Sequence, residues 1–214
     1  MKKKVLWISI IINIIFLAQL ILVSFKYRET LLQKWIKRKH SADIVMFGDS
    51  HTANGEWSFL IEGNSVLRMG YGGHSSSQLS SLIPLTIEYK PKYVFILCGG
   101  NDIGYKNFSV KEVMSNFKFM ADTLKKNNLK PVFQKLLYQH NSLKYNRSID
   151  SINFHLTNYC LKEKIDLIDI GAGMYDSTGL KANLTNDKCH LNKKGYKIWS
   201  AIINNFLKDR EKEE

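Results

Sequence analysis

From Ala42 onward the chain alternates short apolar runs with segments of helix length. Five runs have the length and composition of strands, and they are Ile44–Phe47, Val66–Met69, Tyr93–Cys98, Pro131–Leu136 and Asp166–Ile170. The first and third are apolar throughout, which indicates strands that are buried on both faces. Strands that alternate with helices predict a parallel sheet covered on both sides, with its ligand crevice at the carboxyl ends of the strands.

Four amphipathic segments supply the expected helices, and they are Ser76–Tyr89, Val110–Lys126, Ile149–Lys164 and Lys194–Leu207. Ser109 followed by Glu112 predicts a capping box at the start of the second helix. The last helix is expected to turn Ile198, Ile202 and Phe206 inward, and the residues after it to be frayed. We therefore predict one α/β domain over residues 42–208 and a charged tail over residues 209–214.

The N-terminal part of the chain has a different composition. Residues 5–25 form a run of 21 residues without a charge, long enough as a helix to span a bilayer core of roughly 30 Å. The basic residues 1–4 before it also fit a cleavable signal peptide, but no convincing small-x-small cleavage site follows. We predict an uncleaved, single-pass signal anchor at residues 5–25, followed by a basic juxtamembrane stalk at residues 26–41.

The orientation of this predicted anchor depends on two opposing signals. Three lysines precede the apolar run and six basic residues follow it within residues 26–39, so charge counting favours a cytoplasmic domain. Lysines that directly precede a first apolar segment are, however, typical of a signal anchor, and long domains translocate largely regardless of charge. We expect the domain to lie outside the cytoplasm. The stalk either rests on an anionic lipid surface as an amphipathic helix or is solvated.

The net charge of +12 by itself suggests binding to nucleic acid. Residues 1–40, however, contain nine Lys or Arg and one Glu, which account for +8 of that charge. The remaining domain is only mildly basic and has no basic stripe interleaved with aromatic residues, so we expect no nucleic-acid partner. Three cysteines at wide spacing, Cys98, Cys160 and Cys189, provide neither a disulfide framework nor a paired zinc motif. We expect no metal and no cofactor.

Small and polar residues follow three of the predicted strands, and a fourth polar block lies near the C-terminus. The four blocks are Phe47-Gly48-Asp49-Ser50-His51-Thr52, Met69-Gly70-Tyr71-Gly72-Gly73-His74, Leu97-Cys98-Gly99-Gly100-Asn101-Asp102 and Asp187-Lys188-Cys189-His190-Leu191-Asn192. A lone Gly-Asp-Ser is a common turn. Four blocks in order, three of them where a parallel sheet places its ligands, are a much more specific signal.

On these blocks, residues 42–208 resemble the SGNH hydrolases, the GDSL-type esterases and lipases, in their compact bacterial acylhydrolase branch. The resemblance implies a three-layer α/β/α fold with a flavodoxin-like, five-stranded parallel sheet. It also implies that Ser50 is the nucleophile and that Asp187 and His190 complete a catalytic triad. The oxyanion hole would consist of Ser50, Gly70 and Asn101. We expect Gly70 and Asn101 to affect the rate more than the fold.

Elementary chemistry agrees with these roles. A serine hydroxyl is a poor nucleophile until a base takes its proton, and His190 is a suitable base because histidine is the side chain most often used for this role. Asp187 lies three residues before His190, so one tight turn can bring its carboxylate to the outer ring nitrogen. The N–H groups of Ser50 and Gly70 and the amide of Asn101 can stabilise the negative charge that develops on the carbonyl oxygen.

Neighbouring polar residues have simpler interpretations. We expect Asp49 and Asp102 to bind loop backbone, and His51 and His74 to lie near the site without a defined role. Cys189 is expected to point away from the site, because residues that flank a base in sequence usually do.

The sequence therefore predicts a membrane-anchored serine esterase that hydrolyses short-chain, chiefly O-acetyl, esters on cell-surface carbohydrate. Tyr71 and Trp57 are candidate platforms for stacking against sugar. Alternatives are a lysophospholipase or thioesterase that takes lipid from the bilayer, transfer of the acyl group to a sugar, and a non-catalytic glycan-binding module. The sequence does not define an oligomeric state.

Overall fold

The computed structural model of the 214-residue chain describes residues 13, 16–20, 41–105 and 108–213. It divides into two units, Met1–His40 and Ser41–Glu214. In the first unit, residues 13 and 16–20 are helical and exposed. The predicted anchor at residues 5–25 lies mostly outside the described residues, as do residues 1–4, 26–40 and 214. Among the helices that are described, none is long and apolar enough to cross a membrane.

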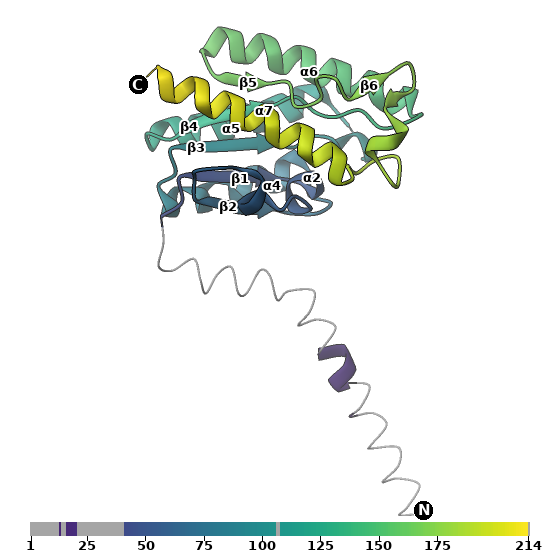
Figure 1. Cartoon of the computed structure of the whole chain (residues 1–214), viewed down its shortest axis with the longest axis horizontal. Coiled ribbons are helices and arrows are strands. Elements are labelled where there is room, and N and C mark those ends of the chain that lie inside the picture. The colour runs from purple at the N-terminus through teal and green to yellow at the C-terminus, as the bar shows by residue number, and fades with distance from the viewer. Residues whose placement is uncertain (1–12, 14–15, 21–40, 106–107, 214) are drawn as a thin grey trace, which may run out of the picture. The chain divides into compact units, whose positions relative to one another are not determined.

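The second unit is a three-layer α/β/α domain built on a five-stranded parallel sheet (Figure 1). The strands are β1 (Ile44–Gly48), β2 (Val66–Gly70), β3 (Tyr93–Leu97), β4 (Lys130–Gln134) and β5 (Asp166–Ile168), in the order β2-β1-β3-β4-β5. All ten residues of β1 and β3 are buried, as their continuous apolar sequence predicts. The predicted parallel α/β fold is confirmed.

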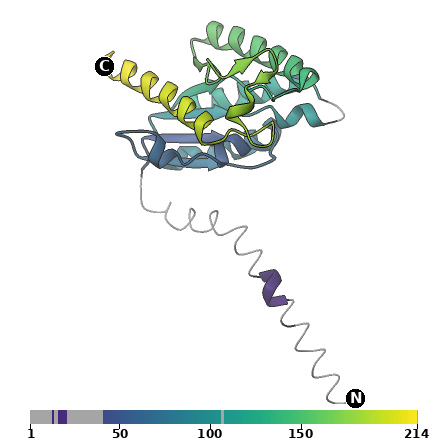
Figure 2. The same ribbon diagram turned by 45° about the vertical axis from the view of Figure 1, so that its right-hand side comes forward.

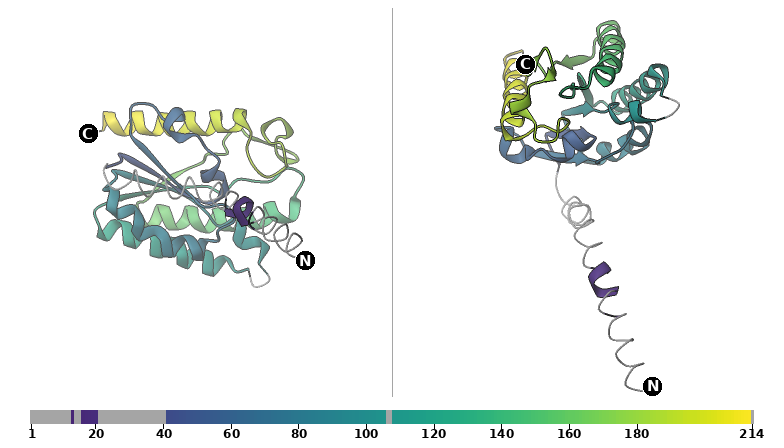
Figure 3. Two further views of the ribbon diagram at one scale, coloured as in Figure 1. Left: turned by 90° about the horizontal axis from the view of Figure 1, so that it is seen from below. Right: turned by 90° about the vertical axis from the view of Figure 1, so that its right-hand side faces the viewer.

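Helices cover both faces of the sheet, as the left view of Figure 3 shows. Helix α7 (yellow) lies on one face, whereas the teal and green helices α5 and α6 lie on the other. The longer helices are α4 (Ser76–Leu82), α5 (Val110–Lys126), α6 (Leu143–Glu163) and α7 (Lys193–Lys212). Two short helices, α2 (Ser50–Ala53) and α3 (Trp57–Leu60), follow β1.

The remaining elements are short. A small antiparallel hairpin of β6 (Tyr175–Asp176) and β7 (Gly179–Leu180) lies beside the first turns of α6 (light green and green, Figure 2). Three 3₁₀ segments are η1 (Ile83–Tyr89), η2 (Asn101–Gly104) and η3 (Ala182–Leu184). The sequence predicts one α-helix over Ser76–Tyr89, but this segment tightens into η1, with Pro84 near the start of the 3₁₀ segment.

Two expectations for the helix starts are wrong. Ser109 begins α5 without a side-chain capping bond, so the predicted box with Glu112 does not form. The capping box occurs instead at α4, where Ser75 accepts from Gln78 N–H and the Gln78 side chain accepts from Ser75 N–H. Helix α6 begins at Leu143, six residues before the predicted start, and its first two turns contribute to the site described below.

The end of the chain also differs from the prediction. Helix α7 continues to Lys212, so residues 209–212 of the predicted tail are helical and not frayed. Arg210 contributes to this, since its guanidinium pairs with Asp166 at the start of β5. The buried face of α7 consists of Tyr196, Trp199, Ile203 and Leu207, and the residues expected to face inward, Ile198, Ile202 and Phe206, are only half-buried.

Candidate active site

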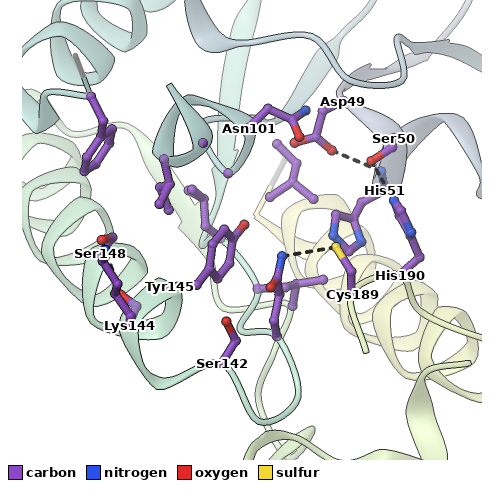
Figure 4. A pocket seen from close by; sticks show the side chains of 18 residues that line it. Asp49, Ser50, His51, Asn101, Ser142, Lys144, Tyr145, Ser148, Cys189 and His190 are labelled. Carbon is purple, nitrogen blue, oxygen red and sulfur yellow. Dashed lines mark hydrogen bonds between the residues drawn. The ribbon is translucent and has the colours of Figure 1, made fainter. Parts of the chain in front are cut away.

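The structure brings the three predicted triad residues together at the carboxyl ends of the strands. Figure 4 shows two of them, Ser50 and His190. Ser50 is the first residue of α2, separated from β1 only by Asp49, and His190 lies in the loop that leads into α7. The Nε2 atom of His190 is 2.9 Å from Oγ of Ser50. The Nδ1 atom of the same ring is 2.7 Å from Oδ2 of Asp187. A base that contacts both the serine and an orienting carboxylate is the arrangement that nucleophilic catalysis requires.

A tight turn fixes the carboxylate relative to the imidazole. Oδ1 of Asp187 accepts the backbone N–H groups of Cys189 (2.9 Å) and His190 (2.7 Å), while Oδ2 faces the ring. Lys188 between them adopts a left-handed conformation with φ 72°. The hydrogen bond with the His190 side chain lowers the pKa of Asp187 below its usual value. The carboxylate is therefore ionised at neutral pH and holds the proton of the ring on Nδ1.

The turn that carries Ser50 depends on a glycine and a buried aspartate. A Cβ at Gly48 would lie 2.1 Å from the carbonyl oxygen of Leu97, so only glycine fits between β1 and β3. Asp49 caps α2, because its Oδ1 accepts the backbone N–H of His51 at 3.0 Å. Asp49 is only 4% exposed, and burial raises the pKa of its carboxyl to about 7. Its predicted role in the loop is confirmed.

Asn101 lies at the start of η2 and lines the same cavity as Ser50 and His190. Its Nδ2 donates one proton to the carbonyl oxygen of His74 at 3.0 Å. That bond orients the amide and leaves its second proton available to a substrate oxygen. The next residue, Asp102, binds the backbone N–H and the hydroxyl of Ser76 at 2.8 and 2.6 Å. This pair ties the loop after β3 to the start of α4, as expected for a backbone-binding aspartate.

The structure gives Gly70 a packing role that the sequence does not reveal. A Cβ at this position would lie 2.2 Å from the backbone nitrogen of Ala53 in α2. Any side chain here must displace the helix that begins with Ser50, so Gly70 also matters for the fold, which the expectation of a role chiefly in rate does not include. Gly70 is not among the residues that line the catalytic cavity. Its role as an oxyanion donor stays a prediction.

A cavity of about 620 Å³ opens beside Ser50 and His190. One part of its lining is apolar and comes from the end of β3 and from the segments that follow β3 and β4: Leu97, Ile103, Phe108, Leu136 and Leu137. The other part is polar and consists of Asp49, His51, Asn101, Gln139, Ser142, Lys144, Tyr145 and Ser148. The lining of this cavity therefore offers both apolar contacts and hydrogen-bonding groups.

Three expectations about neighbouring residues are corrected. Cys189 does line the cavity, where its Sγ accepts from Nε2 of Gln139 at 3.4 Å. Burial raises the pKa of this thiol, which disfavours the thiolate needed for a cysteine nucleophile. Trp57 is 1% exposed and donates to the carbonyl oxygen of Thr52, so it is no stacking platform. Tyr71 packs against Phe47 and does not line the cavity.

The contribution of α6 to the site could not be found in the sequence. Its first two turns place Lys144, Tyr145 and Ser148 in the cavity lining (Figure 4). No motif marks these residues, since their position depends on how α6 packs beside the loop after β4. His51, to which the sequence assigned no role, also lines the cavity. Within the described parts of the chain, no group of three or more His, Cys, Asp or Glu side chains is arranged to hold a metal ion.

Residues 46–198 match the model of the GDSL-like lipase/acylhydrolase family, and the chain belongs to this family. The predicted resemblance is thereby confirmed. The fold is similar to that of an acylhydrolase from Bacteroides fragilis, with a TM-score of 0.70, 22% identity and coverage of 78% of this chain and 86% of that one. It is also similar to an acetylxylan esterase from Geobacillus stearothermophilus, with a TM-score of 0.66, 16% identity and coverage of 78% and 94%.

A curated relative is the N-acylneuraminate cytidylyltransferase of Streptococcus agalactiae serotype III. It is 28% identical over 167 residues, which are 72% of this chain and 40% of the relative. The chain thus spans well under half of the length of this relative.

Proposed function

We propose that this chain is a serine esterase that hydrolyses short-chain acyl esters through Ser50, His190 and Asp187. The observation that supports this most directly is the continuous contact from Ser50 Oγ through the His190 ring to Asp187. His190 takes the hydroxyl proton as Oγ attacks the ester carbonyl, and then gives that proton to the departing alcohol. Water, activated by the same imidazole, hydrolyses the acyl-enzyme and regenerates the free serine.

The negative charge of each tetrahedral intermediate requires hydrogen-bond donors. In this proposal they are the backbone N–H of Ser50, the free amide proton of Asn101 and the N–H of Gly70. Loss of one such donor typically costs about 3 kcal/mol of transition-state stabilisation. Asn101→Ala should therefore lower kcat by about 100-fold while leaving the fold intact, because this side chain is at the cavity and outside the core.

The proposed substrate is an O-acetylated carbohydrate at the cell surface, and a sugar of the N-acylneuraminate type is the first candidate. The curated relative that shares this region is named for N-acylneuraminate, and one solved structure of similar fold is described as an acetylxylan esterase. The polar part of the cavity lining supports binding of an alcohol rich in hydroxyl groups. The compact domain supports a short acyl group, since each methylene left in water forgoes about 0.8 kcal/mol.

Nitrophenyl esters of graded chain length test this proposal on the full chain. We expect a higher kcat/KM for acetyl and propionyl esters than for octanoyl esters. Release of acetate from an O-acetylated N-acetylneuraminate should also exceed cleavage of a lysophospholipid. Faster turnover of the lipid would contradict the proposed substrate.

A lysophospholipase or thioesterase is the second candidate. The five apolar residues that line the cavity, Leu97, Ile103, Phe108, Leu136 and Leu137, favour it, because they can bind part of a longer acyl chain. A non-catalytic glycan-binding module is a weaker candidate, since carbohydrate binding alone does not require Ser50 within 2.9 Å of His190. Measurable burst kinetics with nitrophenyl acetate would exclude that module.

We further propose that residues 5–25 anchor the chain in a membrane, with the hydrolase domain outside the cytoplasm. The uncharged run of 21 residues and the lysines before it support this proposal. Carbonate extraction should leave the full chain in the membrane pellet, and protease added to intact spheroplasts should digest the domain. Protection of the domain until lysis would place it in the cytoplasm and would rule out a cell-surface substrate.

A further inference from the structure

His51 follows the nucleophile directly and differs from the residue in the name of the family. The GDSL motif ends in leucine, whereas this chain reads Gly48-Asp49-Ser50-His51. Leucine can offer only apolar contact, but an imidazole can also donate or accept a hydrogen bond. The surroundings of the His51 ring therefore determine which hydrogen bond this side chain can make that leucine cannot.

The two nitrogens of the His51 ring are in different environments. Nδ1 is buried and has no hydrogen-bond partner among the described residues. Nε2 likewise has no partner there, but it is not one of the buried atoms, and the ring lines the catalytic cavity. Figure 4 shows the ring next to that of His190, and the two ring centroids are 5.3 Å apart. The ring thus turns Nδ1 into the protein and leaves Nε2 open to the cavity.

These environments determine the charge and the tautomer of His51. Burial, with a smaller contribution from the charge of His190, lowers the pKa of His51 to about 4. The ring is therefore neutral at physiological pH and carries a single N–H. A proton on Nδ1 would bury an unpaired donor, which costs about 1–3 kcal/mol, whereas a buried lone pair is better tolerated. The proton accordingly resides on Nε2, and the cavity contains a neutral donor beside the base.

We propose that His51 is a specificity-determining residue that donates its Nε2–H to an oxygen of the alcohol portion of the substrate. His190 must return its proton to the departing alcohol, so the alcohol lies against the His190 ring. The neighbouring His51 ring is therefore close to that portion of the substrate. The inference rests on the proposed esterase function and adds to it a preference for alcohols that carry further oxygen atoms, as sugars and polyols do.

Two acetyl esters that differ only in their alcohol test this role. Glycerol monoacetate carries two hydroxyl groups that n-propyl acetate lacks, and the acyl group is the same. We expect the full chain to favour the glycerol ester, measured as the ratio of the two kcat/KM values. In His51→Leu this ratio should fall about tenfold, and in His51→Gln, which keeps an N–H at a similar reach, it should stay within about threefold of the original.

Controls separate a lost hydrogen bond from a damaged site. His155→Leu makes the same exchange at an exposed position of α6 outside the catalytic cavity and should not alter the ratio. Labelling of Ser50 by a fluorophosphonate in each variant verifies that the nucleophile is still activated. The ¹⁵N resonances of the His51 ring are identified as those that the unmodified chain shows and His51→Gln lacks. At pH 7 these resonances should have the shifts of a neutral ring protonated on Nε2.

The possible outcomes have distinct meanings. Equal loss of both activities in His51→Leu, or an unchanged ratio, would overturn the role of His51 and leave the esterase proposal intact. A ring protonated on Nδ1 would also overturn it. Failure of the unmodified chain to hydrolyse either ester would overturn the proposed function and, with it, the role of His51.

Discussion

Ser50 and His190 are 140 positions apart in the sequence, yet the Ser50 hydroxyl and the His190 imidazole are within hydrogen-bond distance at 2.9 Å. Two contacts of α7 maintain this pairing. The Tyr196 hydroxyl donates to the carbonyl oxygen of His51 at 2.7 Å, and the Trp199 ring packs edge-on against Trp57. Helix α7, which follows His190, is thus held against α2 and α3, the two short helices that begin at Ser50 and Trp57. The geometry of the proposed site therefore depends on the packing of α7.

Replacing either member of this pair should remove activity without unfolding the domain. Ser50→Ala and His190→Ala are expected to lower kcat by about 10³-fold or more, with Tm nearly unchanged, since both side chains lie at the cavity. Nitrophenyl acetate hydrolysis and thermal unfolding measure the two effects. Ser81→Ala, an exposed substitution on α4, is the matched control. Activity of Ser50→Ala comparable to the original, or fluorophosphonate labelling of Cys189, would contradict the assignment.

Asp187→Asn tests the negative charge of Asp187 separately from the turn that its side chain stabilises. Asparagine keeps an oxygen that can accept the N–H groups of Cys189 and His190, but it removes the charge that faces the ring. We expect kcat to fall by about 100-fold or more with little change in Tm. Because the pKa of Asp187 is lowered from 3.8, the carboxylate is ionised throughout pH 5–8. The defect should therefore persist across that range, and its disappearance at pH 5 would argue against an ionised Asp187.

The parts of the fold that the sequence predicts well are those determined by local composition. β1 and β3 are apolar throughout because helices cover both faces of the sheet, and their predicted bounds agree with the structure to within one residue. Ser50 and Asn101 follow these two strands, so a parallel arrangement is enough to bring them to one edge. The contact of Asp187 with His190 is predictable too, because it spans only three residues.

The parts that the sequence does not predict depend on partners that are distant along the chain. Both Ser75 and Ser109 have the pattern of a capping serine, and only the structure distinguishes them. The buried face of α7 is centred on Trp199 instead of Ile198, and Nε1 of Trp199 donates to Gln134 of β4 at 2.7 Å. Hydrophobicity alone cannot show that an indole will find a buried acceptor. The sequence also does not predict the close approach of Gly70 to α2, since a glycine can be required by a turn, by its backbone conformation or by a close contact.

Gly70→Ala should destabilise the domain. The new Cβ would lie 2.2 Å from the backbone nitrogen of Ala53, and overpacking of this kind typically costs about 1–3 kcal/mol. Gly72→Ala is the matched control, because a Cβ there meets nothing within 4 Å and its φ is not in the left-handed region. Chemical denaturation should show a lower free energy of unfolding for Gly70→Ala only. Equal stability of the two variants would mean that α2 adjusts freely, and any loss of rate in Gly70→Ala would then reflect its predicted donor role.

Asp49 and His51, the two residues that flank Ser50, should make stability depend on pH in opposite directions. Burial raises the pKa of Asp49 from 3.8 to about 7, so the folded state binds this proton more tightly than the unfolded state does. The resulting contribution to the free energy of unfolding is fully present below pH 4 and is lost as pH rises toward 7. The pKa of His51 is lowered from 6.5 to about 4. The folded chain therefore resists protonation of this ring, and stability is lost as pH falls from about 6.5 to 4. In the unmodified chain the two effects partly cancel.

Asp49→Asn should separate them. Asparagine can still accept the N–H of His51 and cap α2, but it has no proton to lose. Relative to the original chain, the Tm of the variant should rise progressively between pH 4 and pH 7 and then remain constant. Over that interval only the original chain must keep a proton on Asp49 in the folded state, whereas its unfolded state has released that proton. Asp122→Asn on the exposed face of α5 serves as the control and should follow the original chain at every pH. If the difference in Tm between Asp49→Asn and the original chain is the same at pH 4 and pH 7, then Asp49 titrates alike in the folded and unfolded states, and the buried carboxyl does not hold its proton beside Ser50.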